Sequence, residues 1–136
     1  MKQHFDHHWL ITLPDDWIAE DEDGCVALYH PDGAGMLEIS ADPQAHSIAN
    51  EDLHALAAEH LDAGARVEAT RAGEFDGIEL SYDDAEGNYW REWYLKCDNL
   101  LLFVTYNCDT GDEEREEGLL EVILATLRRK RDPAPG

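Results

Sequence analysis

Residues 76–108, DGIELSYDDAEGNYWREWYLKCDNLLLFVTYNC, decide the fold of this chain. Three apolar and aromatic runs are separated by two polar joints, Asp84–Gly87 and Asp98–Asn99. Gly, Asn and Asp are favoured in turns because they tolerate a positive φ or hydrogen-bond their own backbone. An Asp-Asn pair between two strands suits a two-residue hairpin turn. The pattern therefore predicts three consecutive antiparallel strands.

The lengths of the two joints also predict which side chains share a face of the sheet. We assume a two-residue turn at 98–99 and a four-residue loop at 84–87. The predicted pairs are then Leu95–Leu102, Trp93–Val104, Arg91–Tyr106, Ile78–Trp93, Leu80–Arg91 and Tyr82–Tyr89. Residues opposite each other in an antiparallel pair lie on the same face. A single apolar surface is therefore expected from Ile78, Leu80, Trp93, Leu95, Leu102 and Val104.

The rest of the chain supplies the other elements of one domain. Residues 9–13 read as a strand and the acidic stretch after it as a connection, while 25–40 read as a hairpin around the turn 31–34. A helix is expected from Asn50, as N-cap, to the stop at Gly64, followed by a strand from 66 to 75. A capping box at Thr110 and Glu113 predicts a last helix over about 112–130.

These elements predict an α+β fold with the order β-ββ-α-β-βββ-α. The expected architecture is one antiparallel sheet in an α/β/α sandwich. Residues 1–130 would form a single domain, with 131–136 as a frayed tail.

The charge is the most unusual property of the composition. The chain has 136 residues and a formal net charge of −21, although residues 128–131 are all basic. Such a surface repels DNA, RNA and anionic lipid, so neither nucleic acid nor membrane is an expected partner. Solubility or a salty cytoplasm, a basic protein partner, and mimicry of nucleic acid all remain open as reasons for the charge.

Cysteine usage and hydropathy point to a reduced, cytoplasmic protein. The three cysteines, Cys25, Cys97 and Cys108, are an odd number and match no zinc spacing. Cys97 and Cys108 lie about eight pair positions apart in the predicted meander, too far for a disulfide at about 3.4 Å per residue. No apolar run is long enough to span a membrane, and the N-terminus lacks a secretory signal pattern.

The N-terminal histidines are candidate metal ligands. In one extended strand, His4, Asp6 and His8 would share a face, and neighbours two residues apart could share an ion. Two such ligands make a poor site, and a solvated lead-in to the first strand explains the same residues. No bound cofactor is expected.

A second set of candidates lies on the other face of the predicted meander, and it could bind a partner. These residues are Trp90, Tyr94, Leu101 and Phe103. Either the C-terminal helix covers them, or they form an exposed patch for a protein partner or a homodimer. The chain has no phosphate loop, nucleophile elbow or zinc-protease motif, so an enzyme is not expected.

The succession of elements resembles the PsbP-like fold, which includes the small bacterial DcrB-like domains. The resemblance covers about residues 8–128 and includes Leu13–Pro14 with Trp17, and the stretch Leu37–Ser40. It implies a curved antiparallel sheet in an α/β/α sandwich. Relatives mostly act by binding: one is an extrinsic photosystem subunit, one a nuclear-import factor for a small GTPase, and some are accessory proteins of bacterial secretion. It carries no catalytic residue set, and this sequence lacks the lipoprotein signal of many bacterial members.

The sequence therefore suggests a non-catalytic protein-binding or accessory protein, chaperone- or immunity-like, with an acidic surface. The alternative is a small-molecule or metal-binding domain that uses a sheet–helix cleft and the N-terminal histidines.

Overall fold

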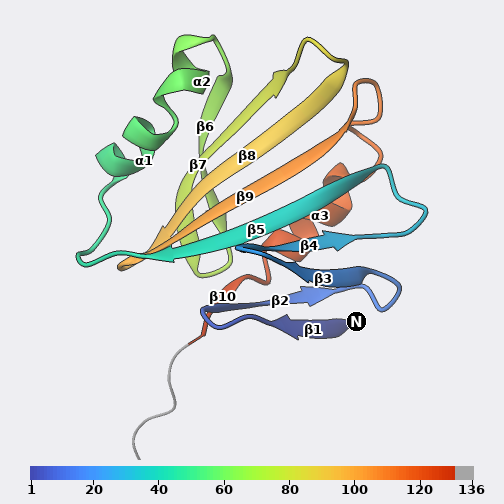
Figure 1. The fold of residues 1–136 in the computed structure, drawn as a ribbon, viewed down its shortest axis with the longest axis horizontal. Helices are drawn as coiled ribbons and strands as arrows, with labels where there is room; N and C mark the ends of the chain where they lie inside the picture. Colours follow the sequence, from blue (N-terminus) through green and yellow to red (C-terminus); the bar gives the residue numbers. More distant parts are fainter. Residues whose placement is uncertain (131–136) are drawn as a thin grey trace, which may run out of the picture.

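A computed structural model describes residues 1–130, and its centre is a seven-stranded antiparallel sheet (Figure 1). Its spatial order is β3-β4-β5-β9-β8-β7-β6. The strands are β3 Ile18–Glu22, β4 Cys25–Tyr29, β5 Gly35–Pro43, β6 Arg66–Ala72, β7 Phe75–Asp83, β8 Asn88–Cys97 and β9 Leu100–Asp109. A small sheet in the order β1-β2-β10 consists of Lys2–Phe5, Trp9–Leu13 and Arg128–Arg129. The expected tail, 131–136, lies outside the described residues.

Helices lie on both faces of the large sheet. Helices α1 (Asn50–Leu56) and α2 (Ala58–Asp62) lie on one face, where Leu53 packs in a buried cluster with Tyr94. Helix α3 (Glu117–Leu124) covers the other, where Leu120 packs in a larger core with Trp93. Neighbouring strand residues point to opposite faces, so the two clusters are separated by the sheet. The α+β sandwich is confirmed, and the predicted elements occur in the predicted order.

The register of the β8–β9 hairpin is confirmed. Leu95 lies opposite Leu102 and Trp93 opposite Val104, with a turn at Asp98–Asn99. Asp98 has a φ of 55°, as a two-residue hairpin turn demands. The four apolar side chains belong to the core on the α3 face.

The predicted register of β7 against β8 is wrong by one residue. Ile78 lies opposite Tyr94, not Trp93, and Leu80 lies opposite Glu92. The connection has five residues between the paired Asp83 and Tyr89, whereas four were expected. A slip of one residue moves every side chain to the other face. Ile78 and Leu80 therefore pack under α1 and are not part of one continuous apolar surface with Trp93.

The side chain of Asp84 explains the longer connection. Its carboxylate accepts hydrogen bonds from the backbone N–H groups of Glu86 (2.8 Å) and Asn88 (3.0 Å). It also accepts one from the indole N–H of Trp90 at 2.9 Å. The hydrogen bond from the backbone N–H of Asn88, followed by the one from the Trp90 indole, lowers the pKa of Asp84 to about 2. The loop is thus held by a side chain, and its length follows from those contacts.

Two acidic or histidine-rich stretches form strands that the sequence pattern did not predict. The chain turns at Asp6–His8, so β1 folds back on β2 and His4 lies opposite Ile11. The expected single extended run through 4–13 is therefore wrong. The expected acidic connection after Trp17 contains β3, which pairs with β4. The β4–β5 hairpin has the register that a turn at residues 31–34 predicts, with Val26 opposite Ile39.

The predicted helices are shorter than expected. The first breaks at Ala57 into α1 and α2, and its N-cap is Ala49 instead of Asn50. Helix α2 ends at Asp62, and Gly64 follows its C-cap with a φ of 92°, as expected of a glycine that stops a helix. The last helix covers Glu117–Leu124 of the expected 112–130, because Arg128 and Arg129 leave it to pair with β2. The basic residues thus form a strand and not a helix end.

The cysteines are free, as expected. Cys97 lies opposite Leu100 and Cys108 opposite Tyr89, at the two ends of the β8–β9 pair.

A buried carboxylate fastens α3 to the β4–β5 hairpin. Glu116, the N-cap of α3, accepts hydrogen bonds from the backbone N–H groups of Ala34 (3.0 Å) and Gly35 (2.9 Å). Its same oxygen accepts one from the Tyr106 hydroxyl at 2.8 Å. Gly35 must lack a side chain here, because a Cβ would lie 2.2 Å from the carbonyl oxygen of Asn107. One carboxylate thus joins two hairpins and a helix.

Replacing Glu116 with alanine should lower the free energy of unfolding by about 1–3 kcal/mol, because it leaves buried donors without an acceptor. Urea denaturation followed by circular dichroism measures the loss. Glu114→Ala, an exposed change in the same acidic stretch, should have little effect, and equal losses in the two variants would contradict the role of Glu116.

Candidate functional site

Half of the sheet face that carries α1 is left uncovered. Helix α1 packs against β7 and β8. Figure 1 shows β9 and β5 without a helix of the described residues over them on this side. We call this half the open face, and it consists of Glu38, Ser40, Asp42, Leu101, Phe103 and Thr105. Each of these side chains is partly or fully exposed, so the face is accessible from solvent.

The four predicted partner-binding residues lie on this side of the sheet but differ in exposure. Tyr94 is only 7% exposed and packs beneath α1 with Leu53. Leu101 and Phe103 are partly buried, and the ring of Phe103 lies 5.0 Å from that of Tyr94. Trp90 is farther along β8, where its indole N–H bonds to Asp84. The structure therefore gathers Tyr94, Leu101 and Phe103, with Leu101 and Phe103 open to solvent.

The expected cover by the C-terminal helix is wrong. Helix α3 packs on the opposite face with Trp93, and α1 covers Tyr94 instead. The reason is the register of β7, which adds Ile78 and Leu80 to this face and gives α1 an apolar surface to pack on.

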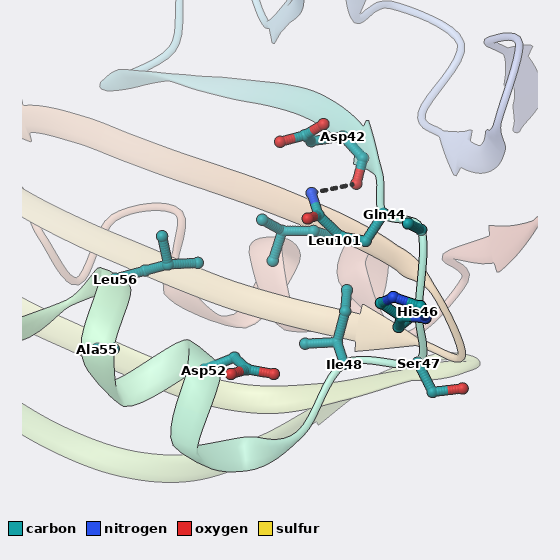
Figure 2. A pocket seen from close by; sticks show the side chains of 10 residues that line it. Asp42, Gln44, His46, Ser47, Ile48, Asp52, Ala55, Leu56 and Leu101 are labelled. Carbon is teal, nitrogen blue, oxygen red and sulfur yellow. Dashed lines mark hydrogen bonds between the residues drawn. The ribbon is translucent and has the colours of Figure 1, made fainter.

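A cleft of about 580 Å³ borders the open face (Figure 2). It lies between α1 and the connection that leads from β5 into it. Leu101 forms its floor, with Ile48 and Leu56 on its walls. Leu56 is 55% exposed although it is a large apolar side chain. A volume of this size falls within the range of about 300–1,000 Å³ typical of ligand clefts.

The rim of the cleft is fixed by hydrogen bonds to the β8–β9 turn. The backbone N–H of Gln44 donates to the carbonyl of Asn99 at 2.7 Å, and that of Ile48 to the carbonyl of Asp98 at 2.9 Å. The Asn99 side chain donates in return to the carbonyl of Gln44 at 2.8 Å. The same turn that sets the register of the sheet therefore also positions the rim, so the cleft is preorganised.

Acidic side chains surround the apolar walls of the cleft. Asp42 and Asp52 line it and are exposed. Asp52 accepts a hydrogen bond from the backbone N–H of Ala49 at 2.9 Å, which helps to start α1. Within residues 1–130 neither aspartate forms an ion pair. A ligand with an apolar group and a positive charge matches this arrangement.

A buried polar network lies between α2 and the sheet. The Glu92 carboxylate accepts hydrogen bonds from the Tyr82 hydroxyl at 2.5 Å and the Tyr94 hydroxyl at 3.0 Å. His60 Nε2 lies 3.3 Å from it, and the His60 ring stacks on Tyr82 at 4.8 Å. Burial raises the pKa of Tyr82 and Tyr94, and the neighbouring Glu92 raises both further. The sequence pattern missed this network because the predicted register put Tyr82 opposite Tyr89, on the other face of the sheet from Glu92.

The structure does not bring the three predicted metal ligands together. His4 Nε2 lies 3.7 Å from Asp21 of β3, while the Asp6 carboxylate accepts from the backbone N–H of His8 at 3.4 Å. Asp6 and His8 lie in the turn between β1 and β2. The prediction placed His4, Asp6 and His8 on one extended strand, and the turn separates them.

Among the described residues, a different group has closely spaced ligand atoms: Glu22, Cys25 and Glu38. The Cys25 thiol lies 3.6 Å from Glu38 and 3.7 Å from Glu22 as a hydrogen-bond donor. Burial and the two negative charges raise the pKa of this thiol. The contacts of the thiol with both carboxylates make the group a hydrogen-bonded cluster.

The fold and the cleft define the class of the protein: an α+β sandwich with one open sheet face beside an apolar, acid-rimmed cleft. Within residues 1–130 no helix combines the length and the apolar character needed to cross a membrane. No family model and no curated protein sequence matches the chain.

Solved structures do match it in fold. A crystal structure from Bacteroides thetaiotaomicron VPI-5482 has a TM-score of 0.63 and 20% identity; the match covers 91% of this chain and 46% of the other. This chain thus spans about half the length of that protein. LpqN of Mycobacterium tuberculosis, described as involved in cell envelope biogenesis, has a TM-score of 0.55 and 15% identity, with 96% and 91% covered. At these identities the likeness shows a shared fold.

The structures similar to this chain also include a PsbP protein, as the sequence resemblance implied. The solution structure of cyanobacterial PsbP (CyanoP) from Synechocystis sp. PCC 6803 has 13% identity, with 95% of this chain and 92% of the other covered. Its TM-score of 0.46 adds no weight to the fold assignment, which rests on the first two structures.

The buried tyrosines predict a loss of stability in alkali. Burial raises the pKa of Tyr94 and Tyr106 above the ordinary value near 10, so the unfolded chain loses these protons first. Stability is then intact below pH 10 and falls as the pH rises above it, by up to about 1.4 kcal/mol per pH unit for each tyrosine. Urea unfolding between about pH 8 and pH 11.5 measures the slope. Tyr94→Phe should reduce it, and an unchanged slope would refute the assignment.

Proposed function

We propose that this chain is a non-catalytic accessory protein that binds a basic segment of another protein at the cleft and the open face. The observation that carries the proposal is the exposed Leu56 beside Ile48 and Leu101, within an acidic rim. The fold shared with LpqN, a protein of cell envelope biogenesis, is compatible with an accessory role.

Apolar contact would supply the binding energy. Leu56, at 55% exposure, and the partly buried Leu101 and Phe103 offer a neighbouring set of apolar side chains. Removing apolar surface from water contributes roughly 25 cal/mol per Å². Partners usually anchor in such a set with one or two large side chains, which carry most of the affinity. An aliphatic or aromatic anchor of the partner would enter between Leu56 and Ile48.

The charge would select a basic partner. Asp42 and Asp52 lie at the rim without ion pairs within residues 1–130, so lysine or arginine beside the anchor would compensate them. The net charge of −21 would attract such a segment over a longer range and raise the association rate at low salt. Acidic partners would be repelled by the same field.

The cysteine environments oppose nucleophilic catalysis. Burial, as the largest cause, raises the pKa of both Cys25 and Cys108, so their thiols stay protonated near neutral pH. The thiolate is the reactive form. Glu92, the most buried carboxylate of the α1 face, is occupied by two tyrosine hydroxyls and is 4% exposed.

The alternative, a cleft that includes the N-terminal histidines, does not match the positions of these residues. His7 and His8 line a separate hollow together with Asp21 and Cys25, whereas the cleft beside α1 contains His46. The cleft beside α1 and the hollow at the N-terminal histidines are therefore separate sites. The apolar walls of the cleft favour it as the binding site.

Leu56→Gln should abolish partner capture, because it removes the most exposed apolar wall of the cleft and keeps the charge. Immobilised chain is incubated with native lysate at low salt, and retained proteins are identified by mass spectrometry. The proposal expects a basic protein that is retained by the wild type, released at about 0.5 M salt, and lost with Leu56→Gln.

Val122→Gln is the matched control. Val122 is 54% exposed on α3, on the opposite face of the sheet. Its replacement therefore removes an equally exposed apolar side chain away from the cleft. The Val122→Gln chain should retain as much of the basic protein as the wild type does. Equal capture by Leu56→Gln, or a loss with both variants, would refute the cleft as the binding site.

A further inference from the structure

Strand β6 presents a free edge of the large sheet. Among the described residues it is the outermost strand and pairs with β7 alone. Arg66, Val67, Glu68 and Ala69 are exposed, and Val67 is 42% exposed although it is apolar. The far end of the strand is closed, because the backbone N–H of Glu74 donates to the carbonyl of Leu127. The open stretch is therefore 66–71, and within residues 1–130 its outer edge pairs with no strand, which leaves backbone donors and acceptors for another strand.

The opposite edge of the sheet is unsuited to pairing with a copy of itself. Strand β3 carries three consecutive acids, Glu20–Glu22, in its five residues. Asp21 of this edge also lies 3.7 Å from His4 of the small sheet. Two copies of β3 would bring six carboxylates together. Strand β6, in contrast, carries charges of both signs, so it can complement itself.

Two charged residues of β6 flank the exposed valine and share one face. Arg66 and Glu68 form no ion pair within residues 1–130. Glu68 lies directly opposite Glu79 of β7, whose carboxylate is bonded to Arg91. Two carboxylates are thus neighbours on this face while Arg91 is bonded to one of them. A cation on the free side of Glu68 would reduce the repulsion between these two carboxylates.

We propose that two copies of this chain pair antiparallel through β6, with Val67 facing Val67 of the second copy. This centre places Arg66 opposite Glu68 of the second copy, and Glu68 opposite its Arg66. The two opposite-charge pairs then flank an apolar pair at the two-fold axis, and backbone pairing extends over residues 66–68 of each copy, where β6 begins. A centre at Glu68 would place two carboxylates opposite each other, so charge favours the centre at Val67 over the centre at Glu68. This inference does not depend on the proposed function.

Sedimentation velocity of the full chain at about 150 mM salt tests the pairing. The wild type should show a monomer–dimer equilibrium. Arg66→Glu or Glu68→Arg alone should weaken the dimer by at least about tenfold, because like charges then face each other. The double variant Arg66→Glu/Glu68→Arg should restore the dimer, since it exchanges the charges and keeps the complementarity.

Three outcomes would overturn the proposal. They are a wild type that is monomeric up to about 100 µM, single variants that dimerise as well as the wild type, and a double variant that stays as weak as the single ones. Leu56→Gln should leave the dimer unchanged, so failure of the pairing and failure of the binding cleft are distinguishable. Both β6 positions tested, Arg66 and Glu68, are solvent-exposed, and circular dichroism checks that each variant is folded.

Discussion

The alternation of side chains along β8 is the constraint on which the rest of this structure depends. Trp93 and Leu95 point toward α3, and Tyr94 between them points toward α1. The tight turn at Asp98 fixes how β9 meets this strand, and the β9 side chains continue both faces. Because the strand period is two, this one register assigns every side chain of the central strands to a layer. It also places Leu101 and Phe103 on the face that α1 leaves open.

The sequence could predict the parts of the fold that short-range turn chemistry determines. The β8–β9 and β4–β5 hairpins have the expected register because their turn residues leave few alternatives. The β7–β8 loop differs because the Asp84 side chain captures the N–H of Asn88, and such a side-chain contact lengthens the loop by one residue. The pairing of Arg128 with Leu10 is a tertiary event between the two ends of the chain, and neither segment carries a signal for it. Strand β3 was not predicted because its run of acidic residues is typical of a connection.

The candidate site was predictable in part for the same reason. Leu101 and Phe103 were assigned to the correct face because they belong to the β8–β9 hairpin. The cleft could not be predicted, since it depends on where the 44–48 connection meets the β8–β9 turn. The Glu92 network required the true β7 register, which brings Tyr82 and Tyr94 to the same carboxylate. A site formed by side chains of neighbouring strands can be predicted only when the register of each strand pair is predicted correctly. One wrong register, here that of β7 against β8, is enough to miss it.

Charge and apolar surface have separate consequences in this molecule. A net charge of −21 acts over a Debye length and brings partners near, but it does not fix an orientation. The apolar walls of the cleft act only on contact, so they would set the position of a bound segment. A two-fold axis perpendicular to the sheet at β6 would keep both open faces on the same side of a dimer. Two clefts presented in one direction would bind a partner with repeated basic segments more tightly than either cleft alone, because the second contact becomes intramolecular.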